Sequence, residues 1–453
     1  MNRYTKQLAI AFLLLAVLTG CRKFLDEKSS KSLVVPSTIT DLQALLDYYP
    51  RVNYFDLNSN EASADDYYLT YTDWNALSLE AYRQLYRWEP YFTIDNFPDD
   101  WGVTYDVVYL ANTVLDKIDA VRRQPGDEGE WRNLKGMALY HRARSFLALA
   151  DTWAPVFNPA TAASDLGIPL KLDPDFNKPV ERASVQQTYN RILQDLKEAV
   201  PLLPVTPLTV LRPSRPAAYG MLARTLLAMG RYAEAGAYAD SCLQLYNRLL
   251  DFNTLNAAAT YPVPEFNAEV IMKTRMRVPP MLNAAYSKID SVLYRSYGEN
   301  DLRKLVFFRS NGNGTYSFKG SYEGSGALFT GIATDEMLLV RAECRARAGK
   351  TTEAMADLNT LLEKRWKAGT FVPLAAASAG EALKIILEER RKELLMRGLR
   401  WMDIKRLNRE GVGIVLKRVL NGQEFVLPPN DPRYALPVPE NVLNLAGIPQ
   451  NPR

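Results

Sequence analysis

The sequence predicts a mainly α-helical fold, in which about four helical pairs stack into a right-handed superhelical scaffold with long loops and short strands inserted between them. Three observations predict it. Apolar residues recur at three- and four-residue steps in several long segments. Two of these segments can be aligned with one another at a fixed offset. The stretches between the helical segments are rich in Tyr, Pro, Asn and Gly, which favours loops and turns. With 453 residues, 47% of them hydrophobic, the chain can bury a large core.

The amino terminus is typical of a secretory signal. Arg3 and Lys6 precede an unbroken apolar run from Leu8 to Leu18, which is too short for a membrane-spanning helix of roughly 20 residues. The following Leu18-Thr19-Gly20-Cys21 resembles the lipobox of bacterial lipoproteins. We therefore expect residues 1–20 to be removed and Cys21 to be acylated, which provides enough buried methylene groups for a stable anchor. The alternative is an ordinary signal peptide followed by an unrelated cysteine.

The rest of the chain is predicted to be one domain behind a short tether. Residues 21–36 are rich in Ser and charged side chains, as a flexible lipidated tether would be. No comparable linker follows, so residues 37–453 are assigned to a single domain. Basic and acidic side chains are nearly equal in number and interleaved along the helical segments, so no basic face for nucleic acid is expected.

Helical periodicity begins at residues 38–49 and returns at 101–122. Prolines mark helix ends at Pro50 and Pro155. Four later regions are assigned to helical repeat pairs, the first of which carries an insertion between Trp153 and Val185. These regions are about 131–203, 214–247, 335–366 and 381–408.

An internal repeat supports this assignment. Residues 214–246 align with residues 335–366 at an offset of 119, and small residues coincide. Gly230 matches Gly349 in the turn between two helical runs, and alanines match on either side of it. This spacing resembles the tetratricopeptide repeat, in which two antiparallel helices meet through a glycine-containing turn. Such units bury their faces only by stacking, so several pairs in series are required. The matched alanines are Ala223 with Ala342 and Ala235 with Ala354.

The irregular stretches are predicted to carry the ligand site. Residues 52–100 and 251–330 are long and rich in aromatic residues, and long segments of this kind are usually functional. Tyr and Trp rings can stack on sugar rings while neighbouring polar groups bind hydroxyls. The alternative is that these rings fill the core beneath the loops. The candidate ligand-binding residues are Asp66, Tyr67, Tyr68, Tyr71, Trp74, Asn75, Trp88, Tyr91, Tyr294, Tyr297, Tyr316 and Tyr322.

Catalytic and metal signals are weak. His141 is the only histidine, so a metal site with two imidazole ligands is excluded, and His141 is interpreted as a hydrogen-bonded packing residue rather than as the base of a Ser-His-Asp set. Cys242 and Cys344 are expected to be buried and unpaired. No cofactor is predicted. Asn58, Glu61 and the following Asp65-Asp66 offer oxygen donors for a structural calcium ion, but without the glycine and terminal glutamate of an EF-hand loop.

Several motifs, in the same order along the chain, resemble those of the SusD/RagB family. The most specific lies near residue 400, where Gly398-Leu399-Arg400-Trp401-Met402-Asp403-Ile404-Lys405-Arg406 follows an Arg- and Glu-rich run that starts at Glu388. Arg397 departs from the pattern, because an acidic residue more often stands before the glycine. The charged block 388–406 is interpreted as a solvated helix face with ion pairs. The other matching segments are 101–112, 137–146, 167–170, 337–343 and 436–439.

This resemblance implies a non-enzymatic, lipid-anchored protein of the bacterial outer membrane that faces the cell exterior. Members of the family capture a nutrient, a glycan or in some cases a peptide, and hand it to a SusC-like TonB-dependent transporter. Two other functions remain open from the sequence. One is a surface glycoside hydrolase, which needs only two carboxylates. The other is a tetratricopeptide scaffold that binds proteins on its concave repeat surface.

Overall fold

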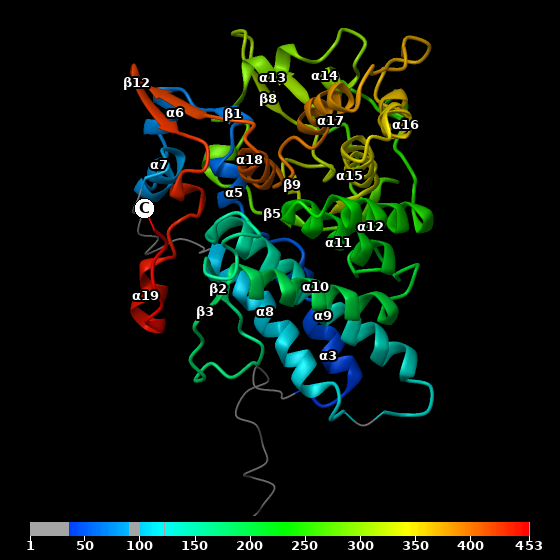
Figure 1. Ribbon diagram of the computed structural model, residues 1–453, viewed down its shortest axis with the longest axis vertical. Helices are drawn as coiled ribbons and strands as arrows, with labels where there is room; N and C mark the ends of the chain where they lie inside the picture. Colours follow the sequence, from blue (N-terminus) through cyan, green and yellow to red (C-terminus); the bar gives the residue numbers. More distant parts are fainter. Residues whose placement is uncertain (1–35, 90–99, 122, 453) are drawn as a thin grey trace, which may run out of the picture.

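The computed structural model describes residues 36–89, 100–121 and 123–452 (Figure 1). The predicted signal segment, the acylation site at Cys21 and nearly all of the predicted tether lie outside these residues. Within them the chain is mainly helical, as predicted, and every sheet has only two strands. No helix in this part of the chain is long and apolar enough to cross a membrane.

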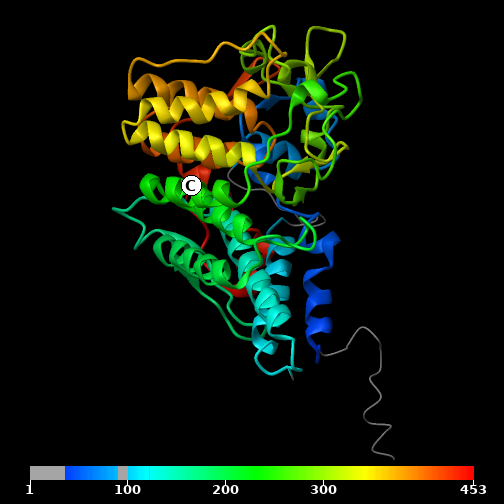
Figure 2. The same cartoon turned by 90° about the vertical axis from the view of Figure 1, so that its right-hand side faces the viewer.

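The scaffold is a series of helices in which each packs against the next one along the series (Figures 1 and 2). A short helix near the amino end, α3 (Ile39–Leu46), covers α8 and α9 at the lower end of the molecule in Figure 1. The insertion at 251–330 separates α12 from α15 in sequence, yet these two helices still pack together. The series consists of α8 (Asp100–Lys117), α9 (Glu128–Trp153), α10 (Val185–Leu202), α11 (Arg215–Met229), α12 (Tyr232–Leu245), α15 (Thr334–Arg347), α16 (Thr351–Glu363) and α17 (Ala379–Glu393).

The internal repeat is confirmed. Helices α11 and α15 begin 119 residues apart, at Arg215 and Thr334, and α12 and α16 begin at the same offset. Gly230 and Gly349 between them have φ angles of 77° and 78°, in the left-handed region that glycine adopts without steric cost. The alanines matched in sequence are all fully buried, so they allow the close approach of neighbouring helices: Ala223, Ala235, Ala342 and Ala354.

The late helical segment divides into two helices, α17 and α18 (Arg400–Arg409). Met396 and Gly398 both have positive φ angles, 58° and 72°, which a right-handed helix cannot accommodate. The chain therefore turns sharply here. Helix α17 packs on α15 and α16, whereas α18 packs on α11 and on α5 (Ser59–Ser63).

The two long insertions pair with each other, and together they lie beside α15–α17 at one end of the molecule (Figure 2). Strand β1 (Tyr67–Tyr68) pairs with β6 (Lys288–Ile289), and Asp56 forms a bridge with Met276. The prediction of loops and short strands is confirmed. The other helices of these insertions are α4 (Tyr49–Val52), α6 (Tyr71–Asn75), α7 (Glu80–Tyr86), α13 (Ser291–Arg295) and α14 (Arg303–Val306).

Short antiparallel strand pairs complete the framework. In the 251–330 insertion they hold the loops against the helices, and elsewhere they close the β2–β3 and β11–β12 connections. The carboxyl-terminal helix α19 (Glu440–Ala446) follows the last pair. The pairs are β4 (Val270–Met272) with β10 (Ile332–Ala333), β5 (Arg275–Met276) with β9 (Leu328–Phe329), β7 (Phe308–Ser310) with β8 (Tyr316–Phe318), β2 (Leu166–Pro169) with β3 (Arg182–Ser184), and β11 (Leu416–Leu420) with β12 (Gln423–Leu427).

The charged block 388–406 is buried, so its interpretation as a solvated face is wrong. Arg390, Arg406 and Glu393 are each at most 2% exposed. Arg406 makes two hydrogen bonds to Glu343, of 2.6 and 2.8 Å, and a third to Asp403. Helical spacing cannot distinguish an exposed charged face from one that meets opposite charges on another element. The role of the block is structural, as expected, but it acts inside the protein.

Arg397, the residue that departs from the family pattern, is accommodated by the same interior. Its guanidinium donates to Asp335 at 3.0 Å. It also lies over the rings of Tyr322 and Phe329, with its central carbon 4.8 and 4.5 Å from the ring centroids. Stacking on aromatic faces is a favourable environment for a guanidinium.

His141 is buried on α9, but neither ring nitrogen has a hydrogen-bond partner among the described residues. Burial, and to a smaller extent the nearby Arg144, lower the pKa of His141 well below its usual value. The unfolded chain therefore takes up a proton near pH 6.5 that the folded protein does not, and stability falls as the pH drops below that value. Between pH 8 and pH 5 we expect this residue alone to remove up to about 2 kcal/mol.

The check is denaturant unfolding of the wild type and His141→Phe at both pH values. The wild type should lose up to about 2 kcal/mol more than the variant on going from pH 8 to pH 5. Comparing the two losses removes any difference in packing between the side chains. Equal losses would show that His141 is protonated in the folded protein.

Candidate functional site

The first part of the candidate site is the short helix α6. Thr70 caps it, because its hydroxyl accepts a hydrogen bond from the Asp73 amide at 3.1 Å while the Asp73 carboxylate binds the Thr70 amide. The cap places Tyr71 and Trp74 on the surface, with ring centroids 5.9 Å apart and planes inclined by 30°. Tyr71 is 45% exposed, whereas Trp74 is half-buried.

Trp74 is held in place from beneath. Its indole nitrogen donates to the Arg83 carbonyl at 3.2 Å, and the Arg87 guanidinium lies 5.0 Å from its ring centroid. An indole that is already held in place loses little conformational freedom when a ligand contacts it. Asn75, next in sequence, is exposed and offers a polar group beside this ring.

The second part is a pair of stacked tyrosines. Tyr294 on α13 lies parallel to Tyr316 on β8, with ring centroids 3.6 Å apart and planes inclined by 14°. Asp290 caps α13 through a 2.7 Å hydrogen bond from the Leu293 amide. The β7–β8 turn contains Gly312 and Gly314, both with φ of 80°, so the two strands form a hairpin. Partial burial, followed by the adjacent Tyr316, raises the pKa of Tyr294 to about 12, so Tyr294 stays neutral near pH 7.

The two parts are joined through the β1–β6 pair, and Figure 1 shows α6, β1, α13 and β8 at the same end of the molecule. The Lys288 ammonium on β6 donates to the Asp73 carboxylate at 2.8 Å. Partial burial would raise the pKa of Asp73, but the hydrogen bonds from Lys288 and Thr70 outweigh it and lower that pKa. We define the aromatic surface as the six predicted residues that remain accessible here: Tyr68, Tyr71, Trp74, Asn75, Tyr294 and Tyr316.

Five other predicted ligand residues are buried, each at most 2% exposed, and their assignment to a ligand surface is corrected. Their polar groups bind partners inside the protein, which agrees with the alternative that these rings fill the core beneath the loops. Tyr91 lies outside the described residues. The buried residues and their partners are Asp66 with Arg391, Tyr67 with the Ala62 carbonyl, Trp88 with the Ser63 carbonyl, Tyr297 with the Lys392 carbonyl, and Tyr322 with Glu269 and Asp335.

The predicted calcium donors do not converge. Asp65 accepts two hydrogen bonds from Arg400, and Asp66 accepts one from Arg391. The Glu61 carboxylate accepts from the Gly398 amide at 2.8 Å. The described residues contain no group of three or more His, Cys, Asp or Glu side chains arranged to hold a metal ion. These carboxylates instead fasten the first insertion to the turn between α17 and α18.

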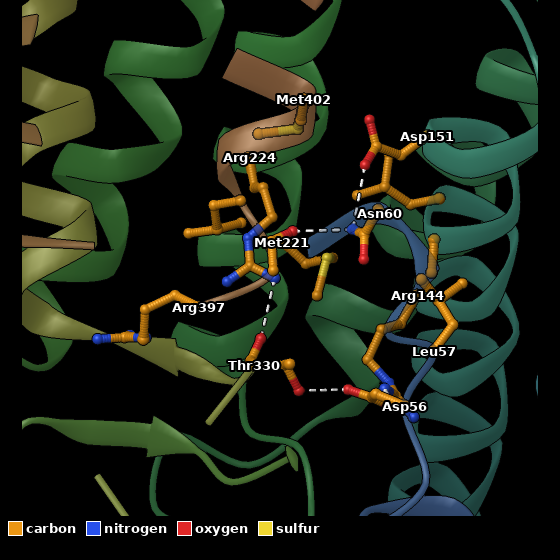
Figure 3. Close-up of a pocket in the computed structure, with 14 residues that line it drawn as sticks. Asp56, Leu57, Asn60, Arg144, Asp151, Met221, Arg224, Thr330, Arg397 and Met402 are labelled. Atoms are coloured by element: carbon orange, nitrogen blue, oxygen red, sulfur yellow. Dashed lines mark hydrogen bonds and ion pairs between the residues drawn. The ribbon is translucent and has the colours of Figure 1, made fainter. Parts of the chain in front are cut away.

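A polar cavity lies where α5, α9, α11 and α18 meet (Figure 3). Its volume is about 70 Å³, well below the 300 Å³ or more of a typical ligand pocket. The charges around it are compensated, because Arg144 pairs with Asp56 and Arg224 binds both oxygens of Glu336. In Figure 3 Asn60 donates toward Asp151, and Arg397 points away from the cavity. We assign this cavity to the structural core.

A larger hollow lies beside the β7–β8 hairpin and was not predicted. It has a volume of about 230 Å³, and its polar lining includes Arg309, Lys319 and Tyr261. Arg309 lies on β7, Lys319 follows β8, and Tyr261 lies in a loop, so their spacing in the sequence shows no periodicity. They come together only because β7 pairs with β8 and because residues 257–261 fold against this hairpin, where Lys319 donates to the Ala257 carbonyl.

Comparison with known proteins identifies the family. Two family profiles match the sequence, one described as starch-binding associating with outer membrane, over residues 23–227, and one described as the SusD family, over residues 302–452. Together they cover most of the chain. A direct comparison with curated proteins gave no match.

Solved structures share the fold over nearly the whole chain. A SusD superfamily protein from Bacteroides thetaiotaomicron superposes with a TM-score of 0.75 at 21% identity, covering 92% of this chain and 100% of its own. A SusD-like carbohydrate binding protein from Bacteroides vulgatus gives 0.68 at 20% identity, with 91% and 97% covered. One from Bacteroides fragilis gives 0.67 at 14% identity, with 90% and 98% covered. The profiles and the shared helical architecture establish that the chain belongs to the SusD/RagB family.

Proposed function

We propose that this protein is a cell-surface lipoprotein that captures oligo- or polysaccharides on the aromatic surface and delivers them to a partner SusC-like TonB-dependent outer-membrane transporter. The lipid anchor at Cys21 holds the domain at the outer membrane, with its body facing the cell exterior. The observation that carries the proposal is the pairing of accessible rings, Tyr71 with Trp74 and Tyr294 with Tyr316, on insertions that strand pairing joins into one surface.

The chemistry of this surface suits a carbohydrate. Aromatic faces pack on the C–H faces of sugar rings, and nearby polar groups satisfy hydroxyls. Asn75 follows Trp74 on α6, and Tyr68 lies on β1, in the strand pair that joins the two parts. Family membership supports the same ligand class, since one matching profile describes starch binding.

A glycoside hydrolase is the second candidate, and the local carboxylates favour binding over catalysis. Asp73 is held by Lys288 and Thr70, and Asp290 caps α13. A general acid and a nucleophile or base would have to be free to act on the glycosidic bond. Product analysis of each glycan after incubation distinguishes the two functions, because a binder leaves its ligand intact. Release of shorter products, abolished by one carboxylate-to-amide change, would establish the hydrolase instead.

The proposal predicts that Tyr71→Ala and Trp74→Ala each weaken glycan binding about 5- to 30-fold, the effect of removing a central aromatic anchor. Isothermal titration calorimetry of the soluble domain beginning at Lys23 checks this against a panel of plant, host and fungal glycans. The matched control is Tyr48→Ala, which removes a 57% exposed tyrosine between α3 and α4, outside the aromatic surface. Its affinity should equal that of the wild type.

The same variants separate the remaining alternatives. A tetratricopeptide scaffold that binds proteins on its repeats would be indifferent to Tyr71→Ala and Trp74→Ala. A peptide-binding member would show saturable heat with peptides and none with glycans. Delivery is tested separately by affinity purification of the full-length, acylated protein from its native outer membrane, where a TonB-dependent barrel should co-purify in stoichiometric amount. Its absence, with glycan binding intact, would remove the transporter partner but keep the capture function.

A further inference from the structure

The hollow beside the β7–β8 hairpin has an unusual charge balance. Of its fourteen lining residues two are basic, Arg309 and Lys319, and none is acidic. Most other arginines of this part of the chain pair with carboxylates, but the Arg309 side chain has no hydrogen-bond or ion-pair partner among the described residues. Its guanidinium is exposed, so it is free to bind an anion from solution.

Lys319 is fixed at the same hollow. Its ammonium donates to the Ala257 and Ala259 carbonyls, at 2.6 and 3.2 Å. These are neutral acceptors, and an ammonium has three donors, so one remains. Partial burial, and then the repulsion from Arg309, lower the pKa of Lys319. Among the described residues no carboxylate lines the hollow or forms an ion pair with either cation. Two uncompensated cations at one hollow favour an anionic occupant.

Neutral polar groups complete the lining. The Asn283 side-chain oxygen accepts a hydrogen bond from the Ala285 amide at 2.9 Å, so its NH₂ group remains as a donor. The Tyr261 hydroxyl stands 3.1 Å from where a side chain on Gly326 would begin, so the glycine lets this hydroxyl approach the loop. Ser325 provides a further hydroxyl. Donors of this kind bind the oxygens of a carboxylate or sulfate group as well as those of sugars.

The hollow adjoins the aromatic surface through the hairpin itself. Ser310 faces Tyr316 and Arg309 faces Ser317 in the strand register, so Tyr316 and Arg309 project from opposite sides of the same two strands. The Ser317 hydroxyl donates to the Ala284 and Ser287 carbonyls, which continue directly into β6 of the aromatic surface. A polysaccharide that crosses the edge of the hairpin would contact the aromatic surface on one side and Arg309 and Lys319 on the other.

We propose that the hollow lined by Arg309 and Lys319 binds an anionic substituent, a carboxylate or a sulfate ester, of the captured glycan, so that the protein selects acidic over neutral polysaccharides. This inference rests on the proposed function. The two cations supply the selectivity, whereas the aromatic surface supplies binding that is common to charged and uncharged glycans.

The test uses matched ligands and the soluble domain beginning at Lys23. Polygalacturonate oligosaccharides are compared with their methyl esters, and a sulfated galactan with its desulfated form, by titration calorimetry. At least one charged form should bind about ten-fold more tightly than its uncharged counterpart, and this ratio should fall with rising sodium chloride. Which pair shows the effect distinguishes a uronate from a sulfate.

Variants locate the effect. Arg309→Gln and Lys319→Gln should each reduce the charged-to-uncharged ratio about ten-fold and leave binding of the uncharged glycan unchanged. Lys384→Gln, which removes an exposed cation on α17, should leave the ratio unchanged. Tyr71→Ala should weaken both forms equally. Equal affinity of the wild type for charged and uncharged forms, or a ratio unaffected by Arg309→Gln, would overturn the inference while the proposed function stands. Failure to bind any glycan would refute the proposed function itself.

Discussion

Replacing Arg365 by Met is expected to lower the free energy of unfolding by about 3–5 kcal/mol, the cost of leaving buried charges without their partner. Arg365 is fully buried where the end of α16 meets α17 and the second insertion. It donates to Glu269 and to Glu393, both at 2.7 Å, and to the Leu250 carbonyl at 2.8 Å. Both carboxylates are also inaccessible to solvent, so water cannot replace the guanidinium. Urea unfolding followed by circular dichroism measures the loss.

The pH dependence of this deficit follows from Glu269. Burial raises the pKa of Glu269 to about 7, even though Arg365 acts to lower it. Because this pKa is raised, the folded protein keeps the carboxyl proton to a higher pH than the unfolded chain does. The free energy of unfolding therefore falls as the pH rises toward the pKa of the folded state. Removing Arg365 raises the pKa of Glu269 further, so the deficit of Arg365→Met should grow as the pH rises above 7 and be smallest at pH 5.

Two further variants test whether the loss of stability in Arg365→Met comes from buried charge. Arg365→Met combined with Glu269→Gln should be more stable at pH 8 than Arg365→Met alone, since glutamine is neutral and needs neither to take up a proton on folding nor to bury a charge. The exposed pair of Lys417 with Glu424 on the β11–β12 hairpin provides the control, and Lys417→Met should change stability by no more than about 1 kcal/mol. If the double variant were less stable than the single one, the buried-charge explanation would be wrong.

Replacing Trp401 by Ala is expected to cost about 3–5 kcal/mol, the usual range for removing a large aromatic side chain from a core. Trp401 is fully buried on α18. Its ring lies 4.9 Å from that of Tyr434, and its indole nitrogen donates to the Tyr434 carbonyl at 3.2 Å. The substitution therefore creates a cavity beneath α18 and also removes a hydrogen bond to the carboxyl-terminal segment. Thermal or urea unfolding of the purified soluble domain measures the effect.

Trp401→Phe separates the two contributions. It keeps an aromatic ring in the site but loses the hydrogen bond to the Tyr434 carbonyl and part of the packed volume, so we expect a smaller loss of about 1–2 kcal/mol. Phe176→Ala is the surface control, because Phe176 is 78% exposed and its removal should have an effect of roughly 0.5 kcal/mol or less. An equally small effect for Trp401→Ala would mean that the core around α18 collapses to fill the space.

Features with a local physical cause could be predicted from the sequence. Helix periodicity located the helical pairs, because a 3.6-residue repeat of apolar side chains is required to bury one face. The repeat at an offset of 119 was visible because Gly230 and Gly349 occupy turns that need a left-handed residue, and matched alanines occupy close helix contacts. The long aromatic insertions were correctly expected to be loops and short strands.

Only the tertiary structure decided which charged and aromatic residues are accessible. Tyr67 and Tyr68 are neighbours in one strand, yet Tyr67 points inward to the Ala62 carbonyl while Tyr68 stays half-exposed, because alternate residues of a strand face opposite sides. The 388–406 block has the pattern of a solvated helix face but pairs with carboxylates from other elements, such as Glu343. Arg309 and Lys319 come together only through the β7–β8 pairing. Burial depends on contacts between residues far apart in the chain, and those contacts leave no periodic signal in the sequence.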